Sequence, residues 1–255
     1  MARESRAEPL ASKARSPRPK ERVYRRSAGR EEAMYLLERG TRFEKTSVML
    51  RVLGRPSSSN AQKVIWLLAE LGVQFTREDY GGKFGRLSTA EYLALNPNGV
   101  IPTLIEGNFV LWESNSICRY LANRHGTTSL YPSAPRDRAL CERWMDWQLS
   151  TLSPGLAPLY IALIRKPSGE QPAIGLPTLR DRARNALSIL DAALAGQRFL
   201  QGDHLTLADI CNGIWTHRWF ALQDNDGVLE NLSAWYARLS ERVAYRHNVI
   251  DVPLE

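Results

Sequence analysis

The chain has 255 residues, and its 34 Lys and Arg against 27 Asp and Glu give a formal net charge of +7. The basic charge is concentrated at one end, because residues 1–46 hold 13 basic and 7 acidic residues and the remainder is close to neutral. A basic body that grips nucleic acid is therefore excluded for most of the chain, and we do not expect a nucleic-acid partner.

Composition narrows the class of protein further. A hydrophobic fraction of 44% with 9% aromatic residues is enough to build a core, which excludes a chain disordered throughout. No apolar run approaches the ~18 residues of a membrane span, and the first residues lack the apolar stretch of a secretory signal. The three cysteines are far apart, and no cysteine or histidine pair has zinc spacing. We therefore expect free thiols, no bound metal, no membrane association and a cytoplasmic location.

Residues 1–48 form a basic N-terminal extension. The stretch from Arg3 to Arg30 is rich in Arg, Ser, Ala and Pro and offers almost no apolar side chains, so we expect it to be disordered. Met34 and Met49 are both possible starts, and the compact pattern begins at Met49. We expect a passive or mis-assigned extension. The alternative is an arm that binds nucleic acid or a membrane surface.

Residues 49–128 show a pattern of short strands and helices. In chain order the expected elements are a strand at 50–53, a helix from the caps at 57–60 to Gly72, a strand at 73–80, a helix at 88–95, strands at 103–105 and 109–112, and a helix at 114–126. A Glu-Gly-Asn turn at 106–108 joins the last two strands as a hairpin. This β-α-β-α-β-β-α order predicts a small mixed-sheet domain.

Beyond a linker at 131–135, the pattern is helical throughout. Helices are expected at 136–163, 178–194, 206–222 and 231–240. Thr206 and Asp209 have the spacing of a capping box, flanked by Leu205 and Ile210 as a hydrophobic staple. Residues 136–250 are therefore predicted to form an all-α domain. The fold class is α+β followed by α: a thioredoxin-like β-α-β-α-β-β-α domain and an all-helical C-terminal domain.

Three motifs point to one family. Residues 96–104 (NPNGVIPTL) and 111–117 (LWESNSI) resemble the glutathione-binding signatures of soluble glutathione transferases. The Ser/Asn-rich turn at 56–60 resembles the serine-type theta-, phi- and nu-like members of bacteria and plants, and the box at 206–209 matches the family's helical-domain motif. The resemblance extends over residues 49–247. It implies a homodimer that uses glutathione as co-substrate, without a further cofactor, to attack a small electrophile.

The resemblance assigns roles to the loop before one strand and to a strand-to-helix junction. It implies a cis peptide bond before Pro102, with Ile101 offering its main-chain N–H and C=O to the cysteinyl part of glutathione. Ser114 and its N–H would bind the γ-glutamyl carboxylate at a helix N-terminus, and Glu113 would pair with the ammonium of the same group. Without the family, these residues are an ordinary trans proline at a strand start, a capping serine and a surface glutamate.

The serine turn supplies the candidate catalytic groups. A free thiol has a pKa near ~8.5, and a hydroxyl that donates to sulfur at a helix N-terminus favours the thiolate. Lowering that pKa by ~2 units makes the thiolate the main form at neutral pH, with no general base required. Phi-like spacing favours Ser58 and theta-like spacing Ser59, Ser57 ranks third, and Asn60 is a second donor as in nu-like members. The alternative is that all four are turn and cap residues.

One departure from the family affects the glycyl end of glutathione. Many relatives carry Lys, Arg or Gln before the Val/Ile-Pro pair, whereas this chain has Val100. Lys83 or Arg86 is then expected to supply the positive charge, unless both are solvated loop charges. A further acidic residue, Glu142, lies five positions before Trp147. It matches the residue that in theta-like relatives reaches across the dimer to the γ-glutamyl ammonium; the alternative is a surface helix charge.

The second substrate is expected to be apolar and electrophilic. Its pocket would lie between the serine turn and the long helix, with walls that otherwise belong to the core. The candidate walls are Trp144, Trp147, Leu152, Tyr160, Trp215 and Trp219. Two other functions stay open: a nu-like, glutathione-dependent disulfide or peroxide reductase, and a non-catalytic binding module with this fold.

Overall fold

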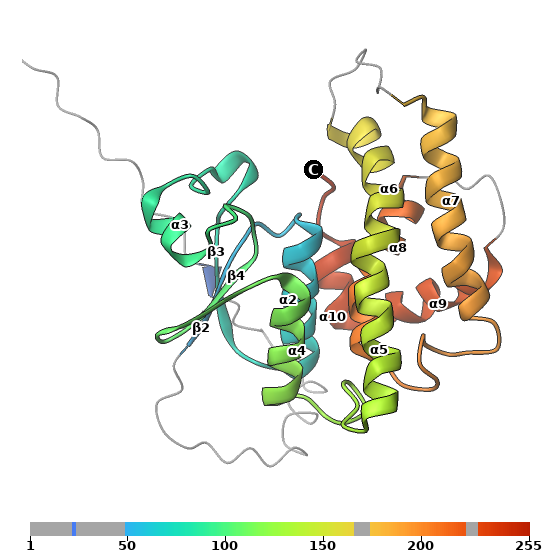
Figure 1. The fold of residues 1–255 in the computed structure, drawn as a ribbon, viewed down its shortest axis with the longest axis horizontal. Helices are drawn as coiled ribbons and strands as arrows, with labels where there is room; N and C mark the ends of the chain where they lie inside the picture. The colour runs from blue at the N-terminus through green and yellow to red at the C-terminus, as the bar shows by residue number, and fades with distance from the viewer. Residues whose placement is uncertain (1–21, 24–48, 166–173, 223–228) are drawn as a thin grey trace, which may run out of the picture.

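The computed structural model describes residues 22–23, 49–165, 174–222 and 229–255. Figure 1 shows a sheet with its helices on the left and a bundle of longer helices on the right. The predicted fold class is confirmed, because a thioredoxin-like half is followed by an all-helical half. Within the described ranges, no helix is long and apolar enough to cross a bilayer.

The sheet is mixed. Its strands are β1 (Arg22–Val23), β2 (Leu50–Leu53), β3 (Phe75–Glu78), β4 (Thr103–Glu106) and β5 (Phe109–Trp112), in the spatial order β1-β3-β2-β4-β5. β2 and β3 run parallel, and β4 pairs antiparallel with both β2 and β5. Leu53 lies opposite Thr103, and Thr103 lies opposite Trp112. The end of β2, the start of β4 and the end of β5 therefore meet at one edge of the sheet.

β1 differs from the prediction made for the N-terminal extension. The extension is predicted to be disordered, yet Arg22 and Val23 pair antiparallel with β3, opposite Arg77 and Thr76. Composition does not signal this pairing, because two residues that pair through their main chains need no apolar side chains. The rest of the extension, with Met34, lies outside the described residues.

Helices lie on both sides of the sheet. They are α2 (Ser59–Leu71), the 3-10 turn η1 (Gly82–Phe84), α3 (Ala90–Leu95) and α4 (Ser114–His125). In Figure 1, α2 and α4 lie between the strands and the helical half, and α3 lies on the other side. α2 ends at Gly72, whose φ of 65° is the left-handed conformation that favours glycine. The predicted C′ glycine is confirmed.

The first helix predicted for the second half is divided in the structure. Residues 136–163 are predicted to be one helix, but the structure has α5 (Pro135–Trp147), η2 (Gln148–Leu152), α6 (Ser153–Tyr160) and η3 (Ile161–Arg165), of which η2 and η3 are π-helical. Pro154 and Pro158 donate no main-chain hydrogen bond, and a proline inside a helix shifts the pattern around it. The apolar periodicity continues through both prolines, which is why it predicts a single helix.

α8 joins the two halves. The remaining helices are α7 (Leu176–Ala193), α8 (Leu207–Ala221), α9 (Glu230–Ser240), α10 (Val243–Tyr245) and the π-helical η4 (Arg246–Ile250), of which α10 and η4 are not predicted from the sequence. Every residue of α8 from Leu207 to Trp219 is buried, and the helix packs against α2 and α4 on one side and α5 on the other. The core of the helical half therefore continues into the sheet half.

The predicted capping box of α8 is present, and it is buried. The main-chain N–H of Thr206 donates to Asp209 Oδ2 at 2.8 Å. The main-chain N–H of Leu200 and Trp235 Nε1 donate to Asp209 Oδ1 at 2.9 and 3.0 Å. One buried carboxylate therefore holds α8, α9 and the loop before α8 together.

Candidate active site

The serine turn lies between the end of β2 and the start of α2. Ser58 is the N-cap of α2, with φ −74° and ψ 124°, and its Oγ accepts from the N–H of Ala61 at 3.4 Å. Ser59 and Asn60 begin the helix and are half-buried. The first N–H groups of a helix have no acceptor within it. The turn therefore combines a capping hydroxyl with main-chain donors at one point.

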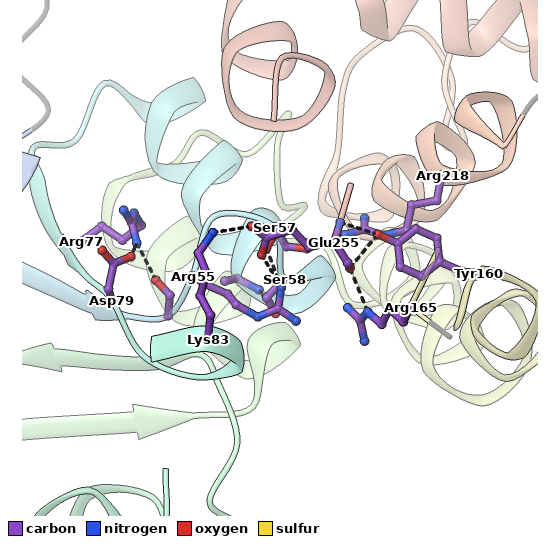
Figure 2. Close-up of polar contacts among 12 residues, drawn as sticks. Arg55, Ser57, Ser58, Arg77, Asp79, Lys83, Tyr160, Arg165, Arg218 and Glu255 are labelled. Carbon is purple, nitrogen blue, oxygen red and sulfur yellow. Dashed lines mark hydrogen bonds and ion pairs between the residues drawn. The ribbon is translucent and has the colours of Figure 1, made fainter. Parts of the chain in front are cut away.

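Ser57 has a different environment from Ser58. Its Oγ donates to Glu255 Oε2 at 2.7 Å and accepts from Arg55 Nη1 at 2.5 Å. Its main-chain oxygen accepts from Arg218 Nη2 at 2.9 Å. Figure 2 shows Ser57 at the centre of these contacts, between the two halves of the molecule. Ser57 thus links the turn to the helical half, whereas Ser58 caps α2.

The Ile101–Pro102 peptide bond is cis, as predicted. The loop before it is held by Asn96, whose Nδ2 donates to the main-chain oxygen of Val100 at 2.7 Å and whose Oδ1 accepts from the N–H of Asn98 at 3.1 Å. Tyr92 OH donates to the same Val100 oxygen at 2.6 Å. The conformation of this loop is therefore set by side chains of α3 and of the turn that follows it.

Glu113 and Ser114 lie where β5 passes into α4. Glu113 has a φ of 70°, a left-handed conformation that costs a non-glycine residue roughly 1–2 kcal/mol. Its side chain is exposed, whereas Ser114, the first residue of α4, is buried. A carboxylate in a strained position beside the N–H groups of a helix start suits a ligand that carries both an ammonium and a carboxylate.

A buried lysine supports this junction, and sequence reasoning missed it. Lys63 of α2 is 1% exposed, and its Nζ donates to Asn115 Oδ1 at 2.8 Å and to Gln148 Oε1 at 2.9 Å. Burial lowers the pKa of Lys63. Asn115 also donates to the main-chain oxygen of Met145 at 2.8 Å. The amide and the lysine therefore fix α2, α4 and α5 together. The signal in the sequence is a lysine inside an otherwise apolar helical stretch.

Glu255 is the second contributor that sequence reasoning missed. Its side chain accepts from Lys83 Nζ at 2.9 Å as well as from Ser57, and these two hydrogen bonds lower the pKa of its carboxyl group. Its main-chain oxygen accepts from Tyr160 OH at 3.0 Å and from Arg165 Nε at 2.8 Å. Figure 2 shows Glu255 between these two sets of partners. They are 90 to 198 residues away along the chain, so no local pattern signals the contact.

The aromatic candidates for the second-substrate pocket lie in different places. Tyr160 contacts Glu255, and its ring lies edge-on to Trp215 with centroids 6.2 Å apart. Trp144 and Trp147 pack edge-on against each other on α5, with centroids 5.2 Å apart. Trp219 is buried in the core. The structure therefore brings Tyr160 to the serine turn, and the roles of the three tryptophans Trp144, Trp147 and Trp219 stay predictions.

The charged candidates have partners within the chain. Glu142 accepts from Tyr131 OH and lies 3.4 Å from Arg119 Nε. The guanidinium of Arg86 lies 4.2 Å from the ring centroid of Tyr80. Of the two cations considered for the glycyl end of glutathione, Lys83 is the one hydrogen-bonded at the site, through Glu255. The reach of Glu142 across a dimer stays a prediction.

The three cysteines, Cys118, Cys141 and Cys211, are free and buried. Burial raises the pKa of Cys141 to about 11, so its thiol is protonated at neutral pH. In the part of the chain that the structure describes, no group of three or more His, Cys, Asp or Glu side chains is placed to hold a metal ion. The cysteines therefore act as small core side chains.

Comparison with known protein families identifies the family to which this chain belongs. The glutathione S-transferase N-terminal domain model matches residues 48–123, and the C-terminal domain model matches residues 152–242. This chain belongs to the glutathione S-transferase family. The two matched segments correspond to the sheet half, which carries the serine turn and the cis-proline loop, and to the helical half, which carries the buried capping box. The family prediction made from the motifs is confirmed.

Individual relatives of this glutathione transferase cover most of its length. GstB of Escherichia coli K12 is 34% identical over 208 residues, which are 81% of this chain and 100% of GstB. Glutathione S-transferase 3 of Zea mays is 30% identical over 212 residues, 80% of this chain and 95% of the maize protein. The solved theta class glutathione S-transferase of Xanthomonas axonopodis pv. citri, with glutathione bound, has a TM-score of 0.77 and 40% identity over 81% of this chain and 99% of that one.

Proposed function

We propose that this glutathione transferase binds glutathione along the sheet edge where β2 ends and β4 begins, and stabilises its thiolate for attack on an electrophile. The observation that carries the proposal is the register of the sheet. Because Leu53, Thr103 and Trp112 lie opposite one another, the serine turn, the cis-proline loop and the Glu113–Ser114 junction leave the sheet side by side. We therefore expect hydroxyls, main-chain groups and two helix starts to contact one glutathione molecule.

The start of α2 is suited to stabilise the thiolate of glutathione. Its first N–H groups lack helical acceptors and carry partial positive charge. The Oγ of Ser58 accepts from Ala61, so its own O–H stays available as a donor to sulfur. Lowering the pKa of the glutathione thiol by ~2 units corresponds to about 2.7 kcal/mol. We assign Ser58 as the donor to sulfur, with Ser59 and Asn60, in the first turn of α2, as the alternatives.

The two ends of glutathione have candidate partners on either side of the serine turn. Ser114 would bind the γ-glutamyl carboxylate at the start of α4, and Glu113 would pair with the ammonium. Glu142 of the other protomer in a homodimer is the further candidate for that ammonium. Val100 offers no charge to the glycyl carboxylate, and Lys83 already holds a carboxylate oxygen of Glu255. The glycyl end is therefore assigned to Lys83, and its cysteinyl neighbour to the main chain of Ile101.

The proposed cellular location, co-substrate and partners of the enzyme follow from the same chemistry. Free, buried thiols suit a reducing compartment, so we place the enzyme in the cytoplasm. Thiolate attack uses glutathione as co-substrate and needs no other cofactor. The partners proposed are thus glutathione, a small electrophile and a second copy of this chain.

The test of the proposed function is a pair of measurements. Calorimetry with glutathione measures binding, and the conjugation of 1-chloro-2,4-dinitrobenzene to glutathione measures turnover. We expect saturable binding and a catalysed rate. Binding without turnover of this or any other electrophile would instead describe a non-catalytic module, and absence of both would refute the proposal.

A second candidate function is favoured by one feature of the turn. Asn60 begins α2 next to the serines, which is the nu-like combination that uses glutathione to reduce disulfides or peroxides. Reduction of hydroxyethyl disulfide by glutathione distinguishes the two functions. A disulfide rate well above the conjugation rate, lost in Asn60→Ala, would favour the reductase.

A further inference from the structure

The peptide group between Ser57 and Ser58 is held on both sides. Its oxygen, which belongs to Ser57, accepts from Arg218 Nη2 at 2.9 Å, and its N–H, which belongs to Ser58, donates to the main-chain oxygen of Arg55 at 3.3 Å. The next main-chain oxygen, that of Ser58, accepts from the N–H of Gln62 at 2.8 Å. The main chain on both sides of Ser58 is therefore fixed, and with it the direction of the bond from its Cα to its Cβ.

Arg218 makes the contact to this peptide that comes from the other half of the molecule. It belongs to α8 and is 1% exposed, and its Nη1 donates to the main-chain oxygen of Ile214 at 3.3 Å. Its guanidinium lies 5.2 Å from the ring centroid of Tyr160 and 5.3 Å from that of Trp215. Aromatic faces attract a cation. The rings and the two main-chain oxygens therefore hold the guanidinium against Ser57.

The charge of Arg218 has no acidic partner in the part of the chain that the structure describes. Its two main-chain acceptors are neutral, and no Asp or Glu of the described ranges lies within ion-pair distance of it. The titratable and charged groups that face it are Tyr160 of α6, Arg165 of η3 and Tyr245 of α10. Burial lowers the pKa of Arg218 to about 10, and the two tyrosines oppose this effect. Arg218 is therefore charged at neutral pH.

An unpaired buried cation stabilises an anion that forms beside it. A buried charge without a counter-charge costs free energy, and an opposite charge nearby offsets part of that cost. The thiolate of glutathione is expected to form beside Ser58, one residue from the oxygen to which Arg218 donates. A nearby cation favours the ionised form of an acid, so the charge of Arg218 is expected to lower the pKa of the thiol.

A second buried arginine lies at the other end of the same loop and provides a contrast. Arg77 of β3 is 5% exposed, and its Nη1 donates to the main-chain oxygen of Gly54 at 2.9 Å. Arg77 also forms an ion pair with Asp79. Figure 2 shows Arg77 and Asp79 on one side of the serine turn and Arg218 on the other. Both arginines hold the main chain of the loop, but the charge of Arg77 is already paired.

We propose that Arg218 is a positioning residue of the transferase reaction, which holds the peptide between Ser57 and Ser58 and supplies the positive charge opposite the glutathione thiolate. This inference rests on the function proposed above and adds to it a residue of α8, which acts on the sulfur through the main chain of the serine turn. When the thiolate forms, the thiol proton goes to solvent, and Arg218 keeps its own protons.

The experiment measures the pKa of the thiol of bound glutathione in the full chain carrying Arg218→Gln. A thiolate absorbs ultraviolet light more strongly than a thiol, so the absorbance at saturating glutathione, followed against pH, gives this pKa. We expect it to rise by about 1 unit compared with the native protein. The kcat/KM for 1-chloro-2,4-dinitrobenzene at pH 6.5 is then expected to fall about tenfold and to approach the native value at pH values above the raised pKa.

Two further variants keep the test decisive. Arg218→Met places an apolar side chain between the rings of Tyr160 and Trp215 and adds no buried polar group, so it replaces Arg218→Gln if that protein does not fold. It is expected to raise the pKa of the thiol equally, and thermal unfolding shows which variants are folded. Arg77→Gln is the matched control, since it also removes a buried arginine from a main-chain oxygen of the loop. We expect it to raise the pKa of the thiol by less than about 0.5 unit.

Two results would overturn the inference. The first is a folded Arg218 variant whose bound glutathione keeps the native thiol pKa, even if conjugation is slower at every pH, because such a loss would be structural. The second is an equal rise of the thiol pKa in Arg77→Gln, since the loss of any main-chain contact of the loop would then be sufficient.

The outcome for the proposed function is distinguishable from these results. If the native protein binds glutathione and conjugates it to 1-chloro-2,4-dinitrobenzene, while the Arg218 variants keep the native thiol pKa, the transferase function stands and the role of Arg218 is refuted. If glutathione does not bind to the native protein and no electrophile reacts, the proposed function is refuted, and this inference is refuted with it.

Discussion

The two sides of the site are built in different ways. On the glutathione side, the serine turn, the cis-proline loop and the start of α4 belong to neighbouring strands, and the register of one sheet brings them together. On the helical side, Tyr160, Arg165, Arg218 and Glu255 come from separate segments, and their meeting depends on how the helices pack around α8. A sheet edge is specified by short motifs, whereas a packed helical surface is specified by the whole core.

The largest expected effect comes from Asp209, the buried carboxylate of the capping box in the helical half. Asp209→Ala leaves the N–H groups of Leu200 and Thr206 and the indole of Trp235 without their acceptor. We expect the free energy of unfolding to fall by about 3–5 kcal/mol, since each buried unpaired donor costs about 1–3 kcal/mol. Urea denaturation checks this. Asp209→Asn, which keeps one acceptor, is expected to lose less, and a loss below about 1 kcal/mol in Asp209→Ala would contradict the role of the box.

The helical half is also expected to lose stability in acid, because of His217 in α8. Burial lowers the pKa of His217 to about 4, from about 6.5 in an unfolded chain. Between these values the unfolded state binds more protons, so stability is complete above pH 6.5 and falls as the pH drops toward 4. The loss is at most roughly 3 kcal/mol. Unfolding measured at pH 4.5 and 7.5 should show this dependence in the native protein and not in His217→Phe.

A matched histidine separates this effect from general acid sensitivity. His204 is exposed, and His204→Gln is expected to keep the full dependence on pH. A His217→Phe protein that loses as much stability between pH 7.5 and 4.5 as the native protein would show that other groups cause the loss.

The glutathione side is best tested through the pH profile of conjugation. In Ser58→Ala the sulfur loses its hydroxyl donor, so we expect the apparent pKa in kcat/KM to rise by about 1–2 units, and the rate at pH 6.5 to fall about ten- to hundredfold. Ser57→Ala serves as the comparison, since its hydroxyl contacts Glu255 and Arg55 instead. A larger shift of the profile in Ser57→Ala than in Ser58→Ala would reverse the assignment. Equal profiles in all three proteins would remove the turn from the mechanism.

The smallest expected effect concerns the glycyl end of glutathione. Lys83→Gln removes an exposed cation, so we expect the KM for glutathione to rise about two- to fivefold with kcat nearly unchanged. Arg86→Gln is the matched variant from the same loop, where the guanidinium stacks on Tyr80. Steady-state kinetics with glutathione as the varied substrate compares them. A larger rise in Arg86→Gln would transfer the role to Arg86.

Much of the glutathione side can be predicted from the sequence because each part has a local signal. The cap of α2 at Ser58 and the C′ position of Gly72 each depend on residues within a few positions of one another, and the cis bond before Pro102 is implied by the family resemblance of residues 96–104. The division of the helix at 136–163 has a local signal too, in Pro154 and Pro158, but the apolar periodicity outweighs it.

The contacts of Glu255 and Lys63 have no such signals. Glu255 reaches its partners only after α8, α9 and η4 have packed, and nothing near position 255 indicates a charged contact. Lys63 is similar, because a lysine in a helix is normally a surface residue and its burial depends on acceptors from α4 and η2. The sequence predicts an apolar second-substrate pocket beside the serine turn, whereas the structure brings Arg55, Arg165 and Arg218 to the surroundings of that turn.

The hydrogen bond from Arg218 to the main-chain oxygen of Ser57 has a consequence for motion. Both groups are buried, and they belong to opposite halves of the molecule. A hinge that opened the halves would have to break this contact and admit water to a guanidinium held inside the core. Residues 251–255, by contrast, are exposed or half-buried along their whole length. We therefore expect ligands to reach and leave the serine turn by displacement of residues 251–255, while the two halves of the molecule keep their relative positions.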